Sequence, residues 1–274
     1  MSSKASGRQR LDLILVERGL AGSRARAQAL ILAGRVRSEG RLLDKPGVRH
    51  PADLPLEVAE GRRYVGRGGH KLAAALLEFA IVVEGRDAID IGASTGGFTQ
   101  VLLESGAGRV IALDVGRGQL DWSLRNDPRV HVMEGCNARY LQASELPYTP
   151  SLAVIDVAFI SLELILPAVV PCLAEEAEVI ALVKPQFEVG RNQVGRGGIV
   201  RDSSLHRQVL DKISACIRGN GWGVQAFCVS PLLGADGNRE FLVHFKPRSP
   251  GLEGAALSAS LQRALERESE EDGT

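Results

Sequence analysis

The stretch Ala88-Ile89-Asp90-Ile91-Gly92-Ala93-Ser94-Thr95-Gly96-Gly97-Phe98 decides the fold, because in it an apolar run leads directly into a glycine-rich turn. Its apolar part is typical of a buried parallel strand, and the glycines leave room for a ligand to approach the backbone. About twenty residues later, 110–114 is a second apolar run that ends in a carboxylate. An acid at that position can reach the hydroxyl pair of a ribose, so the two segments predict a site for a nucleoside-bearing cofactor.

The spacing of the glycines distinguishes between two such cofactors. The turn has the form G-x-x-x-G-G and not G-x-G-x-x-G, and Asp90 lies two residues before its first glycine. A carboxylate there would repel a pyrophosphate but would suit the amino group of a methionine moiety, so S-adenosylmethionine is favoured over NAD. The candidate cofactor-binding residues are Asp90, Gly92, Ser94, Thr95, Gly96, Gly97, Phe98 and Asp114, with Asn137 for the adenine and Asp156 at the end of a later strand.

Strands and helices continue to alternate beyond this stretch. Apolar runs at 130–134, 152–156 and 179–184 predict three more parallel strands, and 224–229 and 240–245 predict a closing pair. The pattern predicts an α/β fold with a doubly wound, mostly parallel, seven-stranded Rossmann-like sheet. Ligands of such sheets bind beyond the carboxyl ends of the strands, so we expect the charged residues there to face one site. Those residues are Asp90, Asp114, Asp156 and Lys184.

Charge is distributed unevenly along the 274 residues, although the formal net charge is zero. Residues 1–71 hold 15 Lys or Arg against 7 Asp or Glu, and the remaining residues hold 18 against 26. Such an asymmetry is expected when one module meets nucleic acid; the alternative is an ordinary solvated basic surface.

Composition argues against several other classes of protein. The four cysteines form no C-x-x-C pair and no zinc-ligand spacing, which disfavours a metal site and suits reduced thiols in the cytoplasm. The sequence has no signal-like amino terminus and no apolar run of about 20 residues, so we expect neither secretion by that route nor a membrane span. The oligomeric state is left open.

Breaks in these patterns divide the chain into five segments. They are a flexible basic arm at 1–9, a small α+β domain at 10–62, a linker at 63–70, a catalytic domain at 71–248 and a partly disordered acidic tail at 249–274. The linker is rich in glycine, and Lys71 begins the apolar run of the next helix. The glycine-rich basic stretch 190–198 is either a substrate lid or a disordered connection.

The small domain resembles a known RNA-binding module. Its pattern predicts two helices followed by short strands, with arginines in the first turn of the second helix, where cations are unfavourable next to the helix dipole. Arg10-Leu11-Asp12, Ser23-Arg24 and Gly34 are similar to the module shared by a ribosomal small-subunit protein, pseudouridine synthases and tyrosyl-tRNA synthetases. The resemblance implies binding of structured RNA through phosphates and shape; a helix pair without a ligand is the alternative. The RNA-binding candidates are Arg10, Arg24, Arg26, Arg35 and Arg37, together with Arg67 in the linker.

The strand ends favour methylation of a ribose over methylation of a base. Enzymes that methylate exocyclic base amines use Asp or Asn followed by Pro-Pro and an aromatic residue, whereas Asp156 is followed by Val-Ala-Phe. Methylation of a cytosine carbon needs a cysteine nucleophile. Cys172 lies sixteen residues beyond Asp156 in an apparent helix and is better explained as a buried structural residue.

A ribose 2′-hydroxyl is a very weak acid and needs a base beside it. A lysine can serve if burial and a second cation lower its pKa, so Lys184 could be the base and Lys71 the second cation. Asp156 and Glu240 would then position the ammonium and the hydroxyl, although their acidity opposes that lowering of the pKa.

The order Lys71, Asp156, Lys184, Glu240 matches the Lys-Asp-Lys-Glu tetrad of the FtsJ-like ribose 2′-O-methyltransferases. With the RNA-binding module and the segments 67–72, 184–188 and 195–202, the chain resembles the TlyA family, also called hemolysin A. The resemblance implies S-adenosylmethionine-dependent 2′-O-methylation of cytidine in ribosomal RNA of the small or large subunit, catalytic roles for the tetrad and a cytoplasmic location. One departure is Tyr64, where relatives with coupled domains have Trp, which weakens any inference of an interdomain switch.

Two other functions compete with this interpretation. The chain could be a non-catalytic RNA-binding or ribosome-assembly factor with a relic cofactor fold, but the intact tetrad argues against that. A membrane-lytic function, suggested by the second family name, has no support in the sequence, which contains no amphipathic basic helix and no apolar span.

Overall fold

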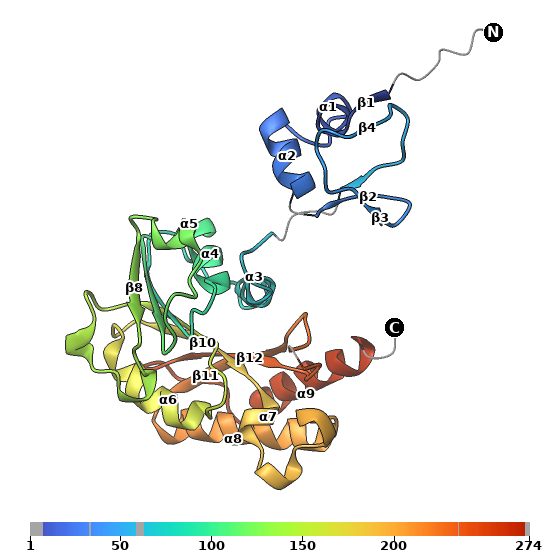
Figure 1. The fold of residues 1–274 in the computed structure, drawn as a ribbon. Coiled ribbons are helices and arrows are strands. Elements are labelled where there is room, and N and C mark those ends of the chain that lie inside the picture. Colours follow the sequence, from blue (N-terminus) through green and yellow to red (C-terminus); the bar gives the residue numbers. More distant parts are fainter. Residues whose placement is uncertain (1–7, 33, 59–62, 235, 272–274) are drawn as a thin grey trace. The chain divides into compact units, whose positions relative to one another are not determined.

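The structure is a computed structural model that describes residues 8–32, 34–58, 63–234 and 236–271. The chain forms two compact units, Met1–Arg63 and Tyr64–Thr274 (Figure 1). Most of the predicted basic arm lies outside the described residues, but its last two residues, Arg8 and Gln9, belong to a strand.

The first unit is a small α+β domain. Its helices are α1 (Leu11–Glu17) and α2 (Arg24–Leu32), and its strands are β1 (Arg8–Arg10), β2 (Val36–Ser38), β3 (Arg41–Leu42), β4 (Arg49–Pro51) and β5 (Glu57–Val58). β1 pairs with β4, and β2 pairs with both β3 and β5, all antiparallel. The helices and β2 enclose a small aliphatic core. The sequence does not predict β1 and β4, because polar residues dominate them and no apolar alternation marks them.

The second unit is built on a seven-stranded sheet with the order β11-β12-β10-β9-β6-β7-β8. The strands are β6 (Asp87–Ile91), β7 (Arg109–Asp114), β8 (Val130–Glu134), β9 (Leu152–Ile155), β10 (Glu178–Val183), β11 (Gly223–Val229) and β12 (Phe241–Lys246). The five neighbouring strands β10, β9, β6, β7 and β8 are parallel, and β12 runs antiparallel to β10 and β11. The predicted doubly wound, mostly parallel sheet is therefore confirmed.

Helices cover both faces of this sheet. They are α3 (Gly68–Glu78), α4 (Gly97–Glu104), α5 (Trp122–Arg125), α6 (Leu162–Val169), α7 (Pro185–Glu188), α8 (Ser203–Gly219) and α9 (Gly254–Glu271). Because side chains alternate along a strand, Ile89 and Ile91 pack on the face covered by α6, α8 and α9, whereas Ala88 packs on the face covered by α3 and α4. β9 and β10 are buried almost throughout, which explains their continuous apolar sequences.

Two predicted boundaries are wrong. Helix α3 begins at Gly68 and not at Lys71, so the last three residues of the predicted linker are helical. Glycine disfavours a helix by propensity, but here its small size is required. A Cβ atom on Gly69 would lie 2.4 Å from Cγ of Tyr64, so only glycine allows the start of the helix to pack against this buried ring.

The expectation of a partly disordered tail is wrong for 254–271, which form helix α9. Leu257, Leu261 and Ala264 are buried, and Ser260 Oγ accepts a hydrogen bond of 3.0 Å from the backbone N–H of Phe227 in β11. The helix thus completes one face of the core. The sequence did not predict this helix because the end of the chain is acidic and only one narrow stripe of the helix is apolar.

Candidate active site

A cavity of about 480 Å³ lies at the carboxyl ends of β6, β7 and β9. Five of the predicted cofactor-binding residues line it: Gly92, Ser94, Asp114, Asn137 and Asp156. The sequence interpretation assigned no cofactor role to Val115, Cys136 or Phe159, which also line it. Val115 and Cys136 come one and two residues after strand ends, and Phe159 comes four residues after β9; this closeness to strand ends is the only signal that could have identified them.

The glycine-rich turn shapes one wall of this cavity. Gly92 has a φ of +87°, and a Cβ atom there would lie 2.2 Å from the carbonyl oxygen of Asp156, so the position requires glycine. Asp114 holds the turn from the neighbouring strand, since its Oδ2 accepts 2.8 Å from the N–H of Ser94 and its Oδ1 accepts 2.6 Å from the N–H of Gly116. Asn137 Oδ1 accepts 3.1 Å from the N–H of Arg139, which fixes the amide at the rim.

Asp90 does not line the cavity, although we expected it to face the site. It is fully buried on the α4 side of the sheet, where its Oδ2 accepts a 2.7 Å hydrogen bond from Thr99 Oγ1. Its Oδ1 has no hydrogen-bond partner among the described residues. Burial raises the pKa of Asp90 to about 7. The reason is that β6 continues to Ile91, so Asp90 is an interior residue of the strand and its side chain points to one face of the sheet.

The other four predicted cofactor residues also lie outside the lining of the cavity. Gly96 is the left-handed residue, with a φ of +94°, that precedes α4. Gly97 packs against residues 66–69, which lead into and begin α3; an added Cβ would lie 3.0 Å from the backbone nitrogen of Gly69. Thr95 and Phe98 adjoin the same segment, because a Cβ on Gly66 would meet Thr95 Oγ1 and one on Gly68 would meet the Phe98 ring. The structure thus gives them packing contacts.

The four predicted catalytic side chains form two ion pairs at this end of the sheet. Lys184 Nζ lies 2.5 Å from Asp156 Oδ1, and Lys71 Nζ is hydrogen bonded to Glu240 Oε2. The Lys71 and Glu240 side chains are 10% and 3% exposed, whereas those of Lys184 and Asp156 are 14% and 22% exposed. Burial raises the pKa of Glu240, although Lys71 and Lys184 oppose that rise.

The sheet topology explains why residues so distant in sequence meet. Asp156 and Lys184 follow the parallel neighbours β9 and β10. Glu240 precedes β12, whose Phe241 pairs with Val183, so Glu240 and Lys184 are continuations of paired strands. Lys71 comes from the first turns of α3, which is close to the same point because a Cβ on Gly68 would lie 3.6 Å from Asp156 Oδ2.

Glu188 connects two segments beside the site and was given no role from the sequence. Its Oε2 accepts 2.6 Å from Ser161 Oγ, and its Oε1 accepts 2.8 Å from the N–H of Leu162. Lys212 Nζ donates to its backbone carbonyl at 2.9 Å. Burial raises the pKa of Glu188. The contacts tie the segment that follows Asp156 to α7, which follows Lys184.

An aromatic pair borders the site on the same side. Phe159 has a φ of +64° and is 91% exposed, and its ring centroid lies 5.1 Å from that of Phe187. Both rings line a second cavity of about 430 Å³, which shares Phe159 with the first cavity.

Cys172, as predicted, is a buried residue, and burial raises the pKa of its thiol.

The glycine-rich stretch 190–198 forms two short 3₁₀ turns. Buried Asn238 anchors its end, since Nδ2 donates 2.9 Å to the carbonyl of Gly198 and Oδ1 accepts 2.9 Å from the N–H of Val200. Asn238 lies two residues before Glu240, so the stretch is tied to the segment that carries one of the tetrad residues.

In the first unit, two of the predicted RNA-binding arginines are held by a buried carboxylate. Asp12 accepts 2.9 Å from Arg10 Nη2 and 3.1 Å from Arg24 Nε, and it also binds Gln28 at 2.8 Å. The bond from Arg10 is the largest of several effects that lower the pKa of Asp12. This explains why α2 tolerates arginine in its first turn. Of the remaining candidates in this unit, Arg26 and Arg37 are exposed and Arg35 is half-buried, while Arg67 is exposed on the second unit.

No helix in the described part of the chain has both the length and the apolarity needed to cross a membrane. The described residues also contain no cluster of His, Cys, Asp or Glu suited to a metal ion.

Comparisons with known proteins bear on both units. The model of the FtsJ-like methyltransferase family matches residues 64–247, and that of the S4 domain matches residues 9–49. The 16S/23S rRNA (cytidine-2′-O)-methyltransferase TlyA of Mycobacterium tuberculosis is 45% identical over 261 residues, which cover 94% of this chain and 97% of the relative. Hemolysin A of Brachyspira hyodysenteriae is 41% identical over 237 residues, which cover 86% and 99%. A solved hemolysin structure from Streptococcus thermophilus is 42% identical, with a TM-score of 0.73 over 98% of this chain and 100% of that chain.

Proposed function

Since the chain belongs to the FtsJ-like methyltransferase family, we propose that this methyltransferase uses S-adenosylmethionine to methylate the 2′-hydroxyl of cytidine in ribosomal RNA of the small or large subunit. The observation that carries the proposal is the convergence of Lys71, Asp156, Lys184 and Glu240 beside a cavity suited to a nucleoside.

The residues that line the cavity fit this cofactor. Asp114 ends the second strand, where a carboxylate can bind the ribose hydroxyls, and Asn137 can bind the adenine edge. Gly92 has no side chain that would block the backbone wall. When bound, the cofactor supplies an electrophilic methyl group. Asp90 is separated from the cavity in this structure, so its contact with the methionine amino group remains a prediction.

Lys184 is the proposed base. Its neutral amine would accept the proton that the 2′-hydroxyl loses when its oxygen takes the methyl group from the sulfonium sulfur, which departs as a neutral thioether. Asp156 would hold both the resulting ammonium and the incoming hydroxyl. Lys71 and Glu240 form the more buried pair, and Glu240 lies close enough to Lys184 and Asp156 to interact with both electrostatically. Orientation of the hydroxyl is the main contribution, because an in-line displacement depends on alignment.

Ribosomal RNA is the proposed substrate for two reasons. The first unit matches the S4 domain and presents exposed arginines such as Arg26 and Arg37. The relative from Mycobacterium tuberculosis is named for methylation of cytidine in 16S and 23S rRNA. A protein that acts on ribosomal RNA works in the cytoplasm, so we propose that location as well.

The decisive experiment supplies the purified chain with isotopically labelled S-adenosylmethionine and ribosomal subunits, and then maps ribose methylation along each RNA. We expect label on cytidine 2′-oxygens in one or both subunits. Subunits that bind the chain without acquiring label would instead support a non-catalytic assembly factor, and label on a base would exclude the ribose mechanism.

A further inference from the structure

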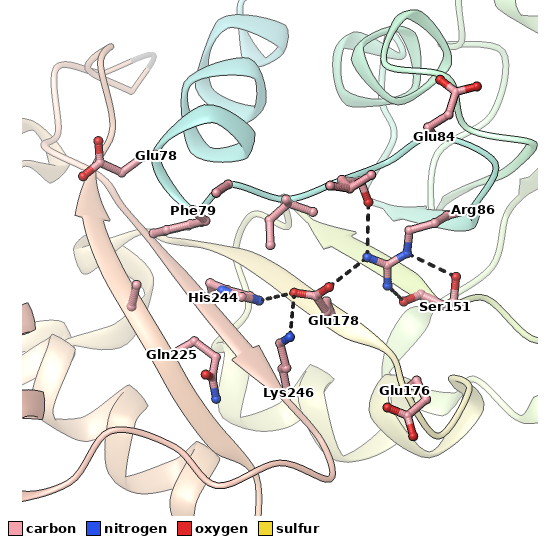
Figure 2. A pocket seen from close by; sticks show the side chains of 14 residues that line it. Glu78, Phe79, Glu84, Arg86, Ser151, Glu176, Glu178, Gln225, His244 and Lys246 are labelled. Atoms are coloured by element: carbon pink, nitrogen blue, oxygen red, sulfur yellow. Dashed lines mark hydrogen bonds and ion pairs between the residues drawn. The ribbon is translucent and has the colours of Figure 1, made fainter.

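A second, larger cleft of about 750 Å³ lies at the opposite end of the same sheet (Figure 2). Residues at the amino ends of the parallel strands line it, among them Ser151 just before β9 and Glu178 at the start of β10. The tetrad lies at the carboxyl ends of those strands, which are four to six residues long, so roughly 20 Å separates the two sites. The cleft therefore takes no direct part in methyl transfer.

The floor of the cleft contains the carboxylate of Glu178, and both of its oxygens have partners. Glu178 Oε1 accepts 3.0 Å from Arg86 Nη1, and its Oε2 lies 2.8 Å from His244 Nε2 and 3.3 Å from Lys246 Nζ, as Figure 2 shows. Burial lowers the pKa of His244, so this ring is neutral near pH 7 and donates its N–H to Glu178. Arg86 also donates to Ser151. The two cations of the floor, Arg86 and Lys246, both pair with Glu178, which offsets part of their positive charge toward an anionic ligand.

The rim of the cleft has the opposite character. Glu84 and Glu176 are exposed, and within the described part of the chain neither has an ion-pair partner. The lining also includes two apolar residues, Ile81 and Val82, the latter 71% exposed. A single exposed apolar side chain such as Val82 is ordinary on a protein surface, but here it shares the lining of one cleft with the two rim carboxylates, so the cleft offers both acidic and apolar contacts.

The chemistry of the cleft selects its occupant. The rim carboxylates would repel a phosphate backbone, whereas a guanidinium or ammonium group would gain charge-assisted hydrogen bonds from them. The methylene stems of Arg and Lys side chains, and apolar residues beside them, would cover Ile81 and Val82. A cleft of this volume accommodates several side chains, more than a single small cation fills.

We propose that this cleft binds a basic, partly apolar peptide segment of a protein partner, with its cationic side chains on Glu84 and Glu176 and its apolar side chains on Ile81 and Val82. The charge complementarity of the rim supports a protein partner and disfavours RNA. The inference does not depend on the proposed methylation, because it uses no residue of the tetrad or of the cofactor cavity.

The test measures binding of a fluorescein-labelled octapeptide of alternating Arg and Leu by anisotropy to the full-length chain. We expect saturable binding, loss of at least about tenfold in affinity for E84K/E176K, and a smaller loss for the isosteric E84Q/E176Q. The matched control E145K/E253K makes the same change in net charge at exposed residues outside the cleft and should bind as the wild type does. Equal affinity for both lysine double variants would overturn the proposal.

A second variant separates a peptide from RNA. Lys246→Ala removes the most exposed cation of the floor, 38% exposed, and leaves His244 as the partner of Glu178 Oε2. Peptide affinity should then rise by about two- to threefold. Weaker binding of single-stranded RNA with unchanged peptide affinity would assign the cleft to RNA and would also overturn the proposal. Methyl transfer by E84K/E176K should equal that of the wild type, since the tetrad is distant.

Discussion

The two ends of the catalytic sheet carry charge networks of different design. At the carboxyl ends, two lysines face two carboxylates in one-to-one pairs, Lys71 with Glu240 and Lys184 with Asp156. At the amino ends, the single carboxylate of Glu178 receives three basic side chains.

The two networks differ in how many hydrogen-bond donors and acceptors they leave free to bind a substrate. A lysine ammonium has three N–H donors, so a pair such as Lys184 with Asp156 keeps donors and lone pairs for a substrate hydroxyl. Both oxygens of Glu178 are already occupied, and its partners are held by it. The first network is suited to a proton transfer and the second to stabilising the fold.

The largest expected effect is on catalysis. Lys184→Ala should reduce the rate of methyl transfer by about 10²- to 10⁴-fold, the usual contribution of a general base, while cofactor affinity stays close to that of the wild type. Lys246→Ala, which removes a lysine from the other network, should leave the rate unchanged. Labelled methyl transfer and calorimetric titration with the cofactor measure the two quantities. Transfer by the Lys184 variant at the wild-type rate would remove this residue from the base role.

The next effect is on stability at the other end. Glu178→Ala should lower the free energy of unfolding of the second unit by about 3 kcal/mol, because it leaves Arg86 largely buried without a counter-charge. The rate of methyl transfer per folded molecule should not change. Urea unfolding followed by tryptophan fluorescence reports on this unit alone, since both tryptophans, Trp122 and Trp222, belong to it. An unchanged unfolding midpoint would show that the network around Glu178 contributes nothing to stability.

Asp90 adds a pH dependence to the catalytic end. Its pKa is about 7 in the folded chain and about 3.9 in an unfolded one, so between those values the folded state keeps a proton that the unfolded state releases. Stability should therefore fall as pH rises from about 4 to 7. Asp90→Asn cannot ionise and should gain about 2 kcal/mol relative to the wild type at pH 8 but not at pH 4. Parallel stability profiles for the two proteins across this range would contradict the assignment.

The smallest effect concerns Glu188. Glu188→Gln keeps an acceptor for Leu162 but removes the charge that faces Lys212, so we expect the rate of methyl transfer to fall by only about threefold. Glu188→Ala removes the acceptor as well, which loosens the contact between the segments after Asp156 and Lys184. We therefore expect its rate to fall by about tenfold. Glu163→Gln is the matched control, because Glu163 pairs with the same lysine at 2.7 Å but is 40% exposed. A rate loss as large in Glu163→Gln would assign the effect to Lys212. Steady-state kinetics should show the change in kcat and not in KM.

Much of the candidate site could be read from local patterns. An apolar run followed by glycines or by a charged residue indicates both a parallel strand and its carboxyl end, which was enough to predict that Asp114, Asp156 and Lys184 share one edge. Side-chain direction was not predictable in the same way. Asp90 was expected at a strand end, but β6 runs one residue further, and the period of two then turns its side chain toward Thr99 and α4.

The sequence by itself determined the strands of the seven-stranded sheet, the glycine-rich turn and the charged residues that follow several strands, because each depends on residue types and spacings within short segments. Only the tertiary structure decided which distant groups became partners. Asp12 with its two arginines, Glu188 with Ser161 and Leu162, Glu178 with its three basic side chains, and α9 with the core all arise from strand pairing and packing between remote segments. Such pairings depend on register and on the depth of burial, which no local pattern encodes.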